Sequence, residues 1–129
     1  SLKMWDEYFI DSNVVGVEIF ESRTGGLHLD PNYNVIIHDA TKLSFLDIIE
    51  NETFDVIIDD GSHYLHEQIQ TFHLLKNKVN KNGIYIIEDI KDIDYSRRYF
   101  EDSLHHNCEI LDLRHVKKRK DDVLVIYKF

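Results

Sequence analysis

The sequence predicts a three-layer α/β protein whose sheet is mostly parallel and ends in an antiparallel C-terminal hairpin. Short runs rich in β-branched and aromatic residues alternate with segments in which apolar residues recur every three or four positions. Two of the runs, 54–60 and 83–89, each end in a pair of carboxylates, with a helical segment between them. The last two runs, 108–113 and 123–129, are too close for a crossover helix, so they are expected to pair antiparallel.

Length and composition predict one folded domain over residues 1–129, because 43% of the residues are hydrophobic and 12% are aromatic. The net charge is −9 and the acids are spread along the chain, which disfavours a nucleic-acid or anionic-membrane partner. The single cysteine, Cys108, cannot form an internal disulfide, and neither a signal peptide nor a membrane-spanning apolar stretch is recognisable. A cytoplasmic location is therefore expected.

The first third of the chain is expected to supply two strands and two short helices. Apolar side chains at 2–9 suit one face of a short helix, and a buried strand follows at 14–20. Two adjacent glycines and the only proline make 21–34 a loop. A second strand, 35–38, and a short helix, 43–49, then lead to the central strand of the protein.

The segment between the two acidic strand ends has helical periodicity. Its apolar residues lie on one face at spacings of four and three: Leu65, Ile69, Phe72, Leu75 and Val79. Strand, helix and strand form a right-handed βαβ unit, so the two strands are expected to be parallel. A further amphipathic helix is predicted over 90–107, and the basic run 117–120 is expected to be a solvated loop, with contact to phosphate or substrate as the alternative.

Parallel strands end at the same edge of a sheet, so the side chains that follow them are expected to share a crevice. Carboxylates crowded in this way repel one another, and either protons or a cation must relieve the repulsion. Oxygen ligands favour Mg²⁺, with Mn²⁺ or Ca²⁺ as alternatives. We predict Asp60, Glu88 and Asp89 as ligands and His63 as a free base. The competing interpretation is that these acids are helix caps, turn formers or solvated surface.

Two further acids lie at the ends of earlier strands. Glu18 ends the strand 14–20, where nucleoside-binding α/β folds hold ribose hydroxyls. Asp39 follows the next strand and could accept a hydrogen bond from an adenine amino group. Each of these assignments is weak taken alone.

The central motifs carry a family resemblance. Residues 58–63, Gln68, Phe72 and 82–89 resemble the metal-dependent sugar O-methyltransferases of the macrocin and mycinamicin type, within the class I S-adenosylmethionine-dependent methyltransferases. The looser parts of the resemblance are 1–5, 16–19 and 123–129. It implies a Rossmann-like methyltransferase sheet, S-adenosylmethionine and Mg²⁺ (or Mn²⁺) as cofactors, and a small-molecule sugar or glycosylated substrate.

The resemblance also implies roles for particular residues. His63 would be the general base that takes a proton from a sugar hydroxyl before the oxygen attacks the sulfonium methyl. The implied Mg²⁺ ligands are Asp60, Glu88 and Asp89, and the implied cofactor contacts are Glu18, Asp39 and Asp59.

The sequence departs from this family at its start, where the first strand and the glycine-rich turn are not found. The sheet is therefore expected to be N-terminally truncated, with two unpaired strand edges, and a homodimer is expected because such edges favour association. A fragment, a strand supplied by another chain and a shortened relative remain open. An O-methyltransferase is the leading function. The alternatives are a non-catalytic binding or assembly module that keeps the metal crevice, and a metal-dependent phosphoesterase.

Overall fold

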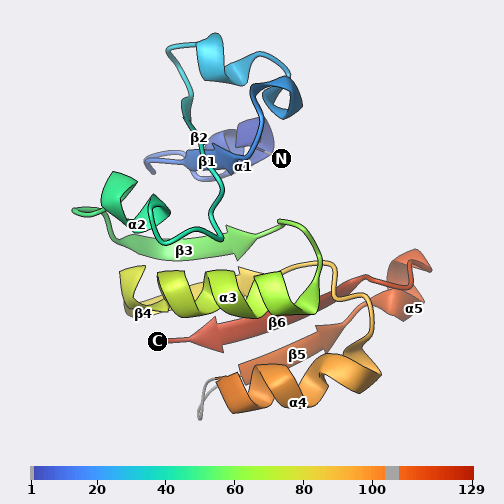
Figure 1. The fold of residues 1–129 in the computed structure, drawn as a ribbon. Coiled ribbons are helices and arrows are strands. Elements are labelled where there is room, and N and C mark those ends of the chain that lie inside the picture. The colour runs from blue at the N-terminus through green and yellow to red at the C-terminus, as the bar shows by residue number, and fades with distance from the viewer. Residues whose placement is uncertain (1, 104–107) are drawn as a thin grey trace. The chain divides into compact units, whose positions relative to one another are not determined.

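The structure of the chain is a computed structural model that describes residues 2–103 and 108–129. The chain forms two compact units, residues 1–45 and 46–129 (Figure 1). The single domain expected over residues 1–129 stays a prediction. Among the described helices, none combines the length and the apolar character needed to cross a membrane.

The first unit contains a two-stranded parallel sheet. Val17 of one strand lies opposite Ile36 of the other. The segment expected to be a loop contains two short 3₁₀ turns separated by two glycines with left-handed backbone, Gly25 and Gly26. The elements in order are α1 (Leu2–Tyr8), β1 (Val15–Glu18), η1 (Glu21–Thr24), η2 (Leu27–Leu29) and β2 (Asn34–Ile37).

The second unit contains a four-stranded mixed sheet in the order β3-β4-β6-β5. Strands β3 and β4 are parallel, and β6 runs antiparallel to both of its neighbours, β4 and β5. The parallel βαβ unit and the antiparallel end of the sheet are therefore confirmed. The elements from residue 45 onward are α2 (Phe45–Ile48), β3 (Phe54–Asp59), α3 (Leu65–Leu75), η3 (Lys76–Lys78), β4 (Val79–Ile87), α4 (Ile93–Ser103), β5 (Cys108–Asp112), α5 (Arg114–Lys117) and β6 (Val123–Lys128).

Aromatic side chains join the sheet to helices α3 and α4. Phe72 of α3 meets Tyr85 of β4 edge to face, with ring centroids 5.1 Å apart, and stacks on Tyr127 of β6 at 4.3 Å. The Tyr127 hydroxyl donates a hydrogen bond to the main-chain oxygen of Phe100 in α4, at 2.8 Å. Because both helices contact Tyr127, they lie on the same face of the sheet, as Figure 1 shows. This core holds β4 in place, and β4 is followed by two acids of the predicted crevice, Glu88 and Asp89.

Strand β4 begins four residues earlier than the sequence predicted. Val79, expected on the apolar face of the preceding helix, instead pairs with Phe54 of β3, so that prediction is wrong. The register then shifts, and the chain comes close to itself at Gly83. A Cβ atom there would lie 2.8 Å from the main-chain oxygens of both Asp55 and Asn80. Only glycine fits without a backbone shift, which explains this residue inside a strand.

Four of the described strands are paired along one edge only: β1, β2, β3 and β5. Within 2–103 and 108–129, β1 pairs with β2 alone and β3 pairs with β4 alone, so no strand joins the two sheets. The N-terminal truncation of the sheet stays a prediction.

Candidate active site

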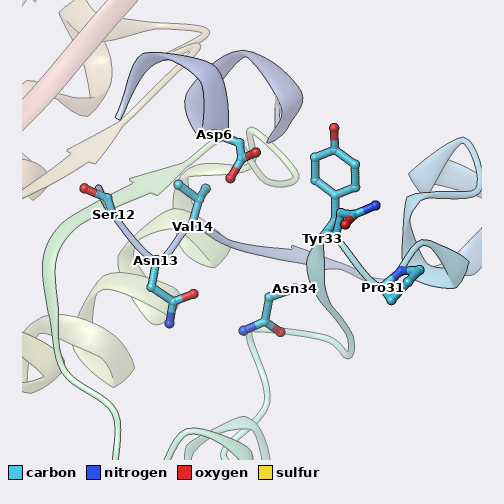
Figure 2. A pocket seen from close by; sticks show the side chains of 8 residues that line it. Asp6, Ser12, Asn13, Val14, Pro31, Tyr33 and Asn34 are labelled. Atoms are coloured by element: carbon cyan, nitrogen blue, oxygen red, sulfur yellow. The ribbon is translucent and has the colours of Figure 1, made fainter. Parts of the chain in front are cut away.

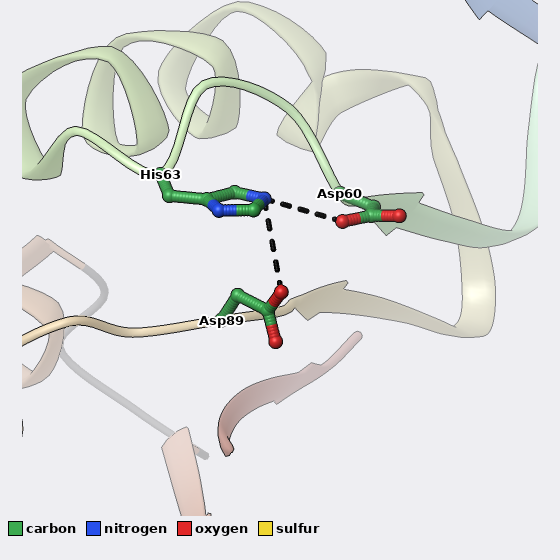
Figure 3. Close-up of side chains that lie close together, drawn as sticks. All are labelled: Asp60, His63 and Asp89. Carbon is green, nitrogen blue, oxygen red and sulfur yellow. Dashed lines mark hydrogen bonds and ion pairs between the residues drawn. The ribbon is translucent and has the colours of Figure 1, made fainter. Parts of the chain in front are cut away.

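The predicted acidic crevice forms at the carboxyl ends of β3 and β4. The Glu88 N–H donates to the main-chain oxygen of Asp59 at 3.0 Å, which continues the parallel pairing past the ends of both strands. Asp60 and Asp89 follow these ends, and His63 lies in the turn after β3. One ligand atom from each of these three residues lies within 4.8 Å of the others (Figure 3). We call this group the acidic cluster.

His63 is the centre of the acidic cluster. Its Nε2 lies 3.2 Å from Oδ1 of Asp60 and 4.0 Å from Oδ2 of Asp89 (Figure 3). His63 lies in the turn before the next helix, because α3 begins only at Leu65. His63 has a left-handed backbone with φ of 59°, and Asp89 has one with φ of 53°. Non-glycine residues adopt this conformation at a cost, and such strain is often found at functional sites.

Arg119 reaches the acidic cluster from the loop before β6. Its Nη2 donates a hydrogen bond to Oδ2 of Asp89 at 2.9 Å. The sequence did not single out this residue, although it belongs to the basic run whose contact with a ligand was left open. A partner 30 positions away along the chain leaves no local signal in sequence spacing.

Glu88 is placed next to the cluster but is not a member of it. Among the described residues, the group of mutually close ligand atoms contains Asp60, His63 and Asp89 only. The main-chain oxygen of Glu88 accepts a hydrogen bond from Nε2 of Gln68 in α3, at 3.1 Å. The role of Glu88 as a metal ligand stays a prediction.

Asp59 is partly buried and is not a member of the cluster. Its Oδ1 accepts a hydrogen bond from the Gly61 N–H at 3.2 Å, and its Oδ2 accepts one from the Tyr85 hydroxyl at 3.3 Å. Burial is the main cause that raises the pKa of Asp59 from 3.8 to about 6, and these hydrogen bonds only partly oppose it. The two adjacent acids of the strand end therefore have different surroundings, as strand alternation predicts.

Replacing Asp59 by asparagine should stabilise the fold at pH 8. The folded state binds the Asp59 proton more tightly than the unfolded state does. The free energy of unfolding of the unchanged chain therefore falls as pH rises from about 4 to about 6. Above that pH range the ionised Asp59 lowers the free energy of unfolding by about 3 kcal/mol, which follows from the difference between its ordinary pKa of 3.8 and its folded-state pKa of about 6. Urea unfolding should show Asp59→Asn more stable by about 2–3 kcal/mol at pH 8 and by little at pH 4.

The matched control for this experiment is Asp55→Asn, which changes an exposed carboxylate on the same strand. This control should not show the gain of about 2–3 kcal/mol at pH 8, because its carboxylate is already exposed to water. A stability gain in Asp59→Asn that is the same at pH 4 and pH 8 would contradict a raised pKa at Asp59.

Glu18 and Asp39 both belong to the first unit. Glu18 ends β1 and accepts a hydrogen bond at Oε2 from the Ile19 N–H, at 3.2 Å. Oδ1 of Asp39 accepts from the N–H and the hydroxyl of Thr41, at 2.9 and 2.7 Å, and Lys42 lies 3.6 Å from its Oδ2. The Thr41 hydroxyl is the largest cause that lowers the pKa of Asp39. Asp39 thus stabilises a local turn, and cofactor contact by either acid stays a prediction.

The first unit also has an open polar hollow of about 450 Å³ at the amino ends of its strands (Figure 2). Asn13 and Asn34 line it just before β1 and at the start of β2, with Asp6 and Tyr33 nearby. Glu18 and Asp39 lie at the opposite, carboxyl ends of these strands, so the hollow contains none of the predicted site residues.

An aromatic ring and an ammonium group meet on the two segments that carry the acidic cluster. Tyr64 follows His63 and is exposed, and the Nζ atom of Lys91 lies 4.5 Å from the centre of its ring. Lys91 is two residues beyond Asp89. This cation–π contact joins the segments after β3 and β4.

The fold of the chain is similar to that of a solved methyltransferase. The MycE methyltransferase from the mycinamycin biosynthetic pathway, in complex with Mg and SAH, matches with a TM-score of 0.71 and 23% sequence identity. The match covers 98% of this chain and 39% of that chain. The chain therefore has the methyltransferase fold, with the mixed parallel and antiparallel sheet that its sequence predicts.

Sequence relatives narrow the class, although no family model matches the chain. The chain is 30% identical over 93 residues to 8-demethyl-8-alpha-L-rhamnosyl tetracenomycin-C 2'-O-methyltransferase of Streptomyces olivaceus, covering 70% of this chain and 24% of that protein. It is 33% identical over 93 residues to Mycinamicin VI 2''-O-methyltransferase of Micromonospora griseorubida, covering 70% and 22%. Its homologues are sugar O-methyltransferases, which confirms the resemblance to class I methyltransferases. The chain spans about a quarter of the length of these relatives.

Proposed function

We propose that this chain is an S-adenosylmethionine-dependent O-methyltransferase, assisted by Mg²⁺ or Mn²⁺, that acts on a hydroxyl of a sugar or polyol. The observation that carries the proposal is the convergence of Asp60, His63 and Asp89 at neighbouring strand ends of a methyltransferase fold. The names of two relatives support the acceptor class, since both are O-methyltransferases of glycosylated antibiotics. MycE has also been solved in complex with Mg, SAH and Mycinamycin VI.

The donor set fits a hard divalent cation. Asp60 and Asp89 offer carboxylate oxygens that lie close enough to share one ion. Asp89 already binds a positive group, the guanidinium of Arg119. Asp60, Asp89 and Glu88 are the proposed ligands, and a bound Mg²⁺ would supply the Lewis acidity that lowers the pKa of a substrate hydroxyl.

His63 is proposed as the base. Its imidazole takes the proton of the acceptor hydroxyl, and the carboxylates of Asp60 and Asp89 stabilise the imidazolium that results. The hydroxyl oxygen forms a bond to the methyl carbon as the sulfur–methyl bond breaks, giving a methyl ether and S-adenosylhomocysteine. The chain's contribution is to hold the base beside the hydroxyl in the correct orientation.

The cofactor and acceptor contacts are proposals of the same kind. Glu18 is proposed to bind the ribose hydroxyls, Asp39 to lie near the adenine and Asp59 to contact the cofactor beside the reacting centre. Tyr64 and Lys91 are proposed to face the acceptor, because they contact each other and lie close to His63 and Asp89 along the chain. A homodimer, a cytoplasmic location and the absence of nucleic-acid and membrane partners stay predictions.

Calorimetric titration of the chain with S-adenosylmethionine, with and without Mg²⁺, tests the proposal. We expect micromolar cofactor binding, and transfer of a labelled methyl group to one or more members of a panel of glycosides when Mg²⁺ is present. Mg²⁺ binding without any cofactor binding would count against the proposal that this chain is a methyltransferase. It would instead favour the alternative, a binding or assembly module that keeps the metal crevice.

A further inference from the structure

One oxygen atom has two competing uses in this structure. Oδ2 of Asp89 belongs to the acidic cluster, where it lies 4.0 Å from Nε2 of His63. The same oxygen accepts the hydrogen bond from Nη2 of Arg119, at 2.9 Å. A cation that bound Asp60 and Asp89 together would approach the position that the guanidinium now holds, and the two positive charges would repel each other.

The loop that carries Arg119 is fixed to the strand beside the cluster. The Leu113 N–H donates to the main-chain oxygen of Asp122 at 2.8 Å, which closes the base of the loop. The Ile90 N–H, directly after Asp89, donates to the main-chain oxygen of Val123 at 3.3 Å. Backbone bonds therefore hold the end of this loop beside the residue that follows Asp89, and the side chain of Arg119 reaches the Asp89 carboxylate from the loop.

Arg119 has a second carboxylate within reach. Its Nε lies 3.4 Å from Oδ1 of Asp121, on the same loop. The side chain of Arg119 is 50% exposed, whereas that of Asp89 is 20% exposed. An ion pair with a half-exposed partner contributes little net stability, so a divalent cation can displace it. Asp121 then keeps the guanidinium paired after it leaves Asp89.

We propose that Arg119 is a built-in counter-cation of the metal site. It pairs with Asp89 in this structure, and it moves to Asp121 alone when a divalent cation binds. This inference rests on the proposed function, because it requires the acidic cluster to bind a metal. Arg119 acts through Asp89 and is therefore a positioning residue. Its presence lowers the affinity of the site for metal.

Titration of the chain with Mn²⁺, followed by electron paramagnetic resonance of the free ion, tests the competition. Arg119→Gln should bind Mn²⁺ about three- to tenfold more tightly than the unchanged chain, because the competing charge is gone. Arg119→Lys should show a smaller increase in Mn²⁺ affinity, since lysine keeps the charge but lacks the forked donors of the guanidinium. Lys120→Gln is the matched control: it removes one positive charge from the same exposed loop and should change the affinity less than about twofold.

A nuclear magnetic resonance readout follows Arg119 itself. The Nε–H signal of Arg119 should shift on addition of Mg²⁺ with the same midpoint as metal binding, and it should stay in place in Asp60→Asn. Unchanged or weaker Mn²⁺ binding by Arg119→Gln, or an equal gain in Lys120→Gln, would overturn the inference while the metal site remains. If neither the unchanged chain nor any of the variants binds Mn²⁺, the metal site of the proposed function is itself wrong.

Discussion

Replacing His63 by asparagine should reduce the turnover number for methyl transfer by about 10²- to 10⁴-fold, the range typical for loss of a general base. Asparagine is chosen because it tolerates the left-handed backbone of residue 63 better than alanine does. Parallel calorimetry should show the affinity for Mg²⁺ changed by less than about threefold, because the proposed ligands are carboxylates. The turnover number and the Mg²⁺ affinity therefore respond differently.

This difference separates the two roles open to His63. The imidazole lies within the group of ligand atoms, so it could bind a metal directly. A large loss of Mg²⁺ affinity in His63→Asn would show that the residue is a ligand and not a free base. His66→Asn provides the control, because His66 is exposed on α3 and lies outside the acidic cluster. Its turnover should match that of the unchanged chain.

Replacing Asp60 by asparagine should weaken Mg²⁺ binding by at least about 100-fold. Loss of a residue that merely supports a ligand costs about 10- to 100-fold in metal affinity, and Asp60 is a proposed ligand itself. The substitution keeps the shape of the side chain and still offers Nε2 of His63 a hydrogen-bond partner at the same position. Calorimetric titration with Mg²⁺, with circular dichroism as a check on folding, measures the effect.

Asp47→Asn is the control for charge alone, because Asp47 is an exposed acid of the same unit outside the cluster. It should leave Mg²⁺ affinity within about twofold, since solvent and salt screen exposed charges. Equal losses in Asp47→Asn and Asp60→Asn would mean that Mg²⁺ responds only to the net charge of the chain. The site at the ends of β3 and β4 would then have to be abandoned.

The parts of the fold that the sequence predicted depend on local pattern and chain direction. Helical periodicity between two acidic strand ends was enough to predict the βαβ unit, and parallel strands must end at one edge. The meeting of Asp60, His63 and Asp89 followed from that geometry. The short connection before β6 was likewise enough to predict its antiparallel pairing with β5.

The features that the sequence did not predict depend on tertiary contacts. Val79 continues the apolar spacing of α3, but strand pairing with Phe54 takes it into β4. The contact of Asp59 with Tyr85 depends on which face of the sheet α3 covers, and the contact of Arg119 with Asp89 depends on the closure of a distant loop. None of these follows from the spacing of residues along the chain.

The left-handed backbone at His63 and Asp89 also affects how the protein would respond to engineering. Each conformation costs about 1–3 kcal/mol, and a glycine at either position would recover part of this cost. Selection for thermal stability alone would therefore favour losing the two side chains on which the proposed chemistry depends. Such a stability–activity trade-off means that a library screened for heat resistance should be counter-screened for metal binding at this corner of the sheet.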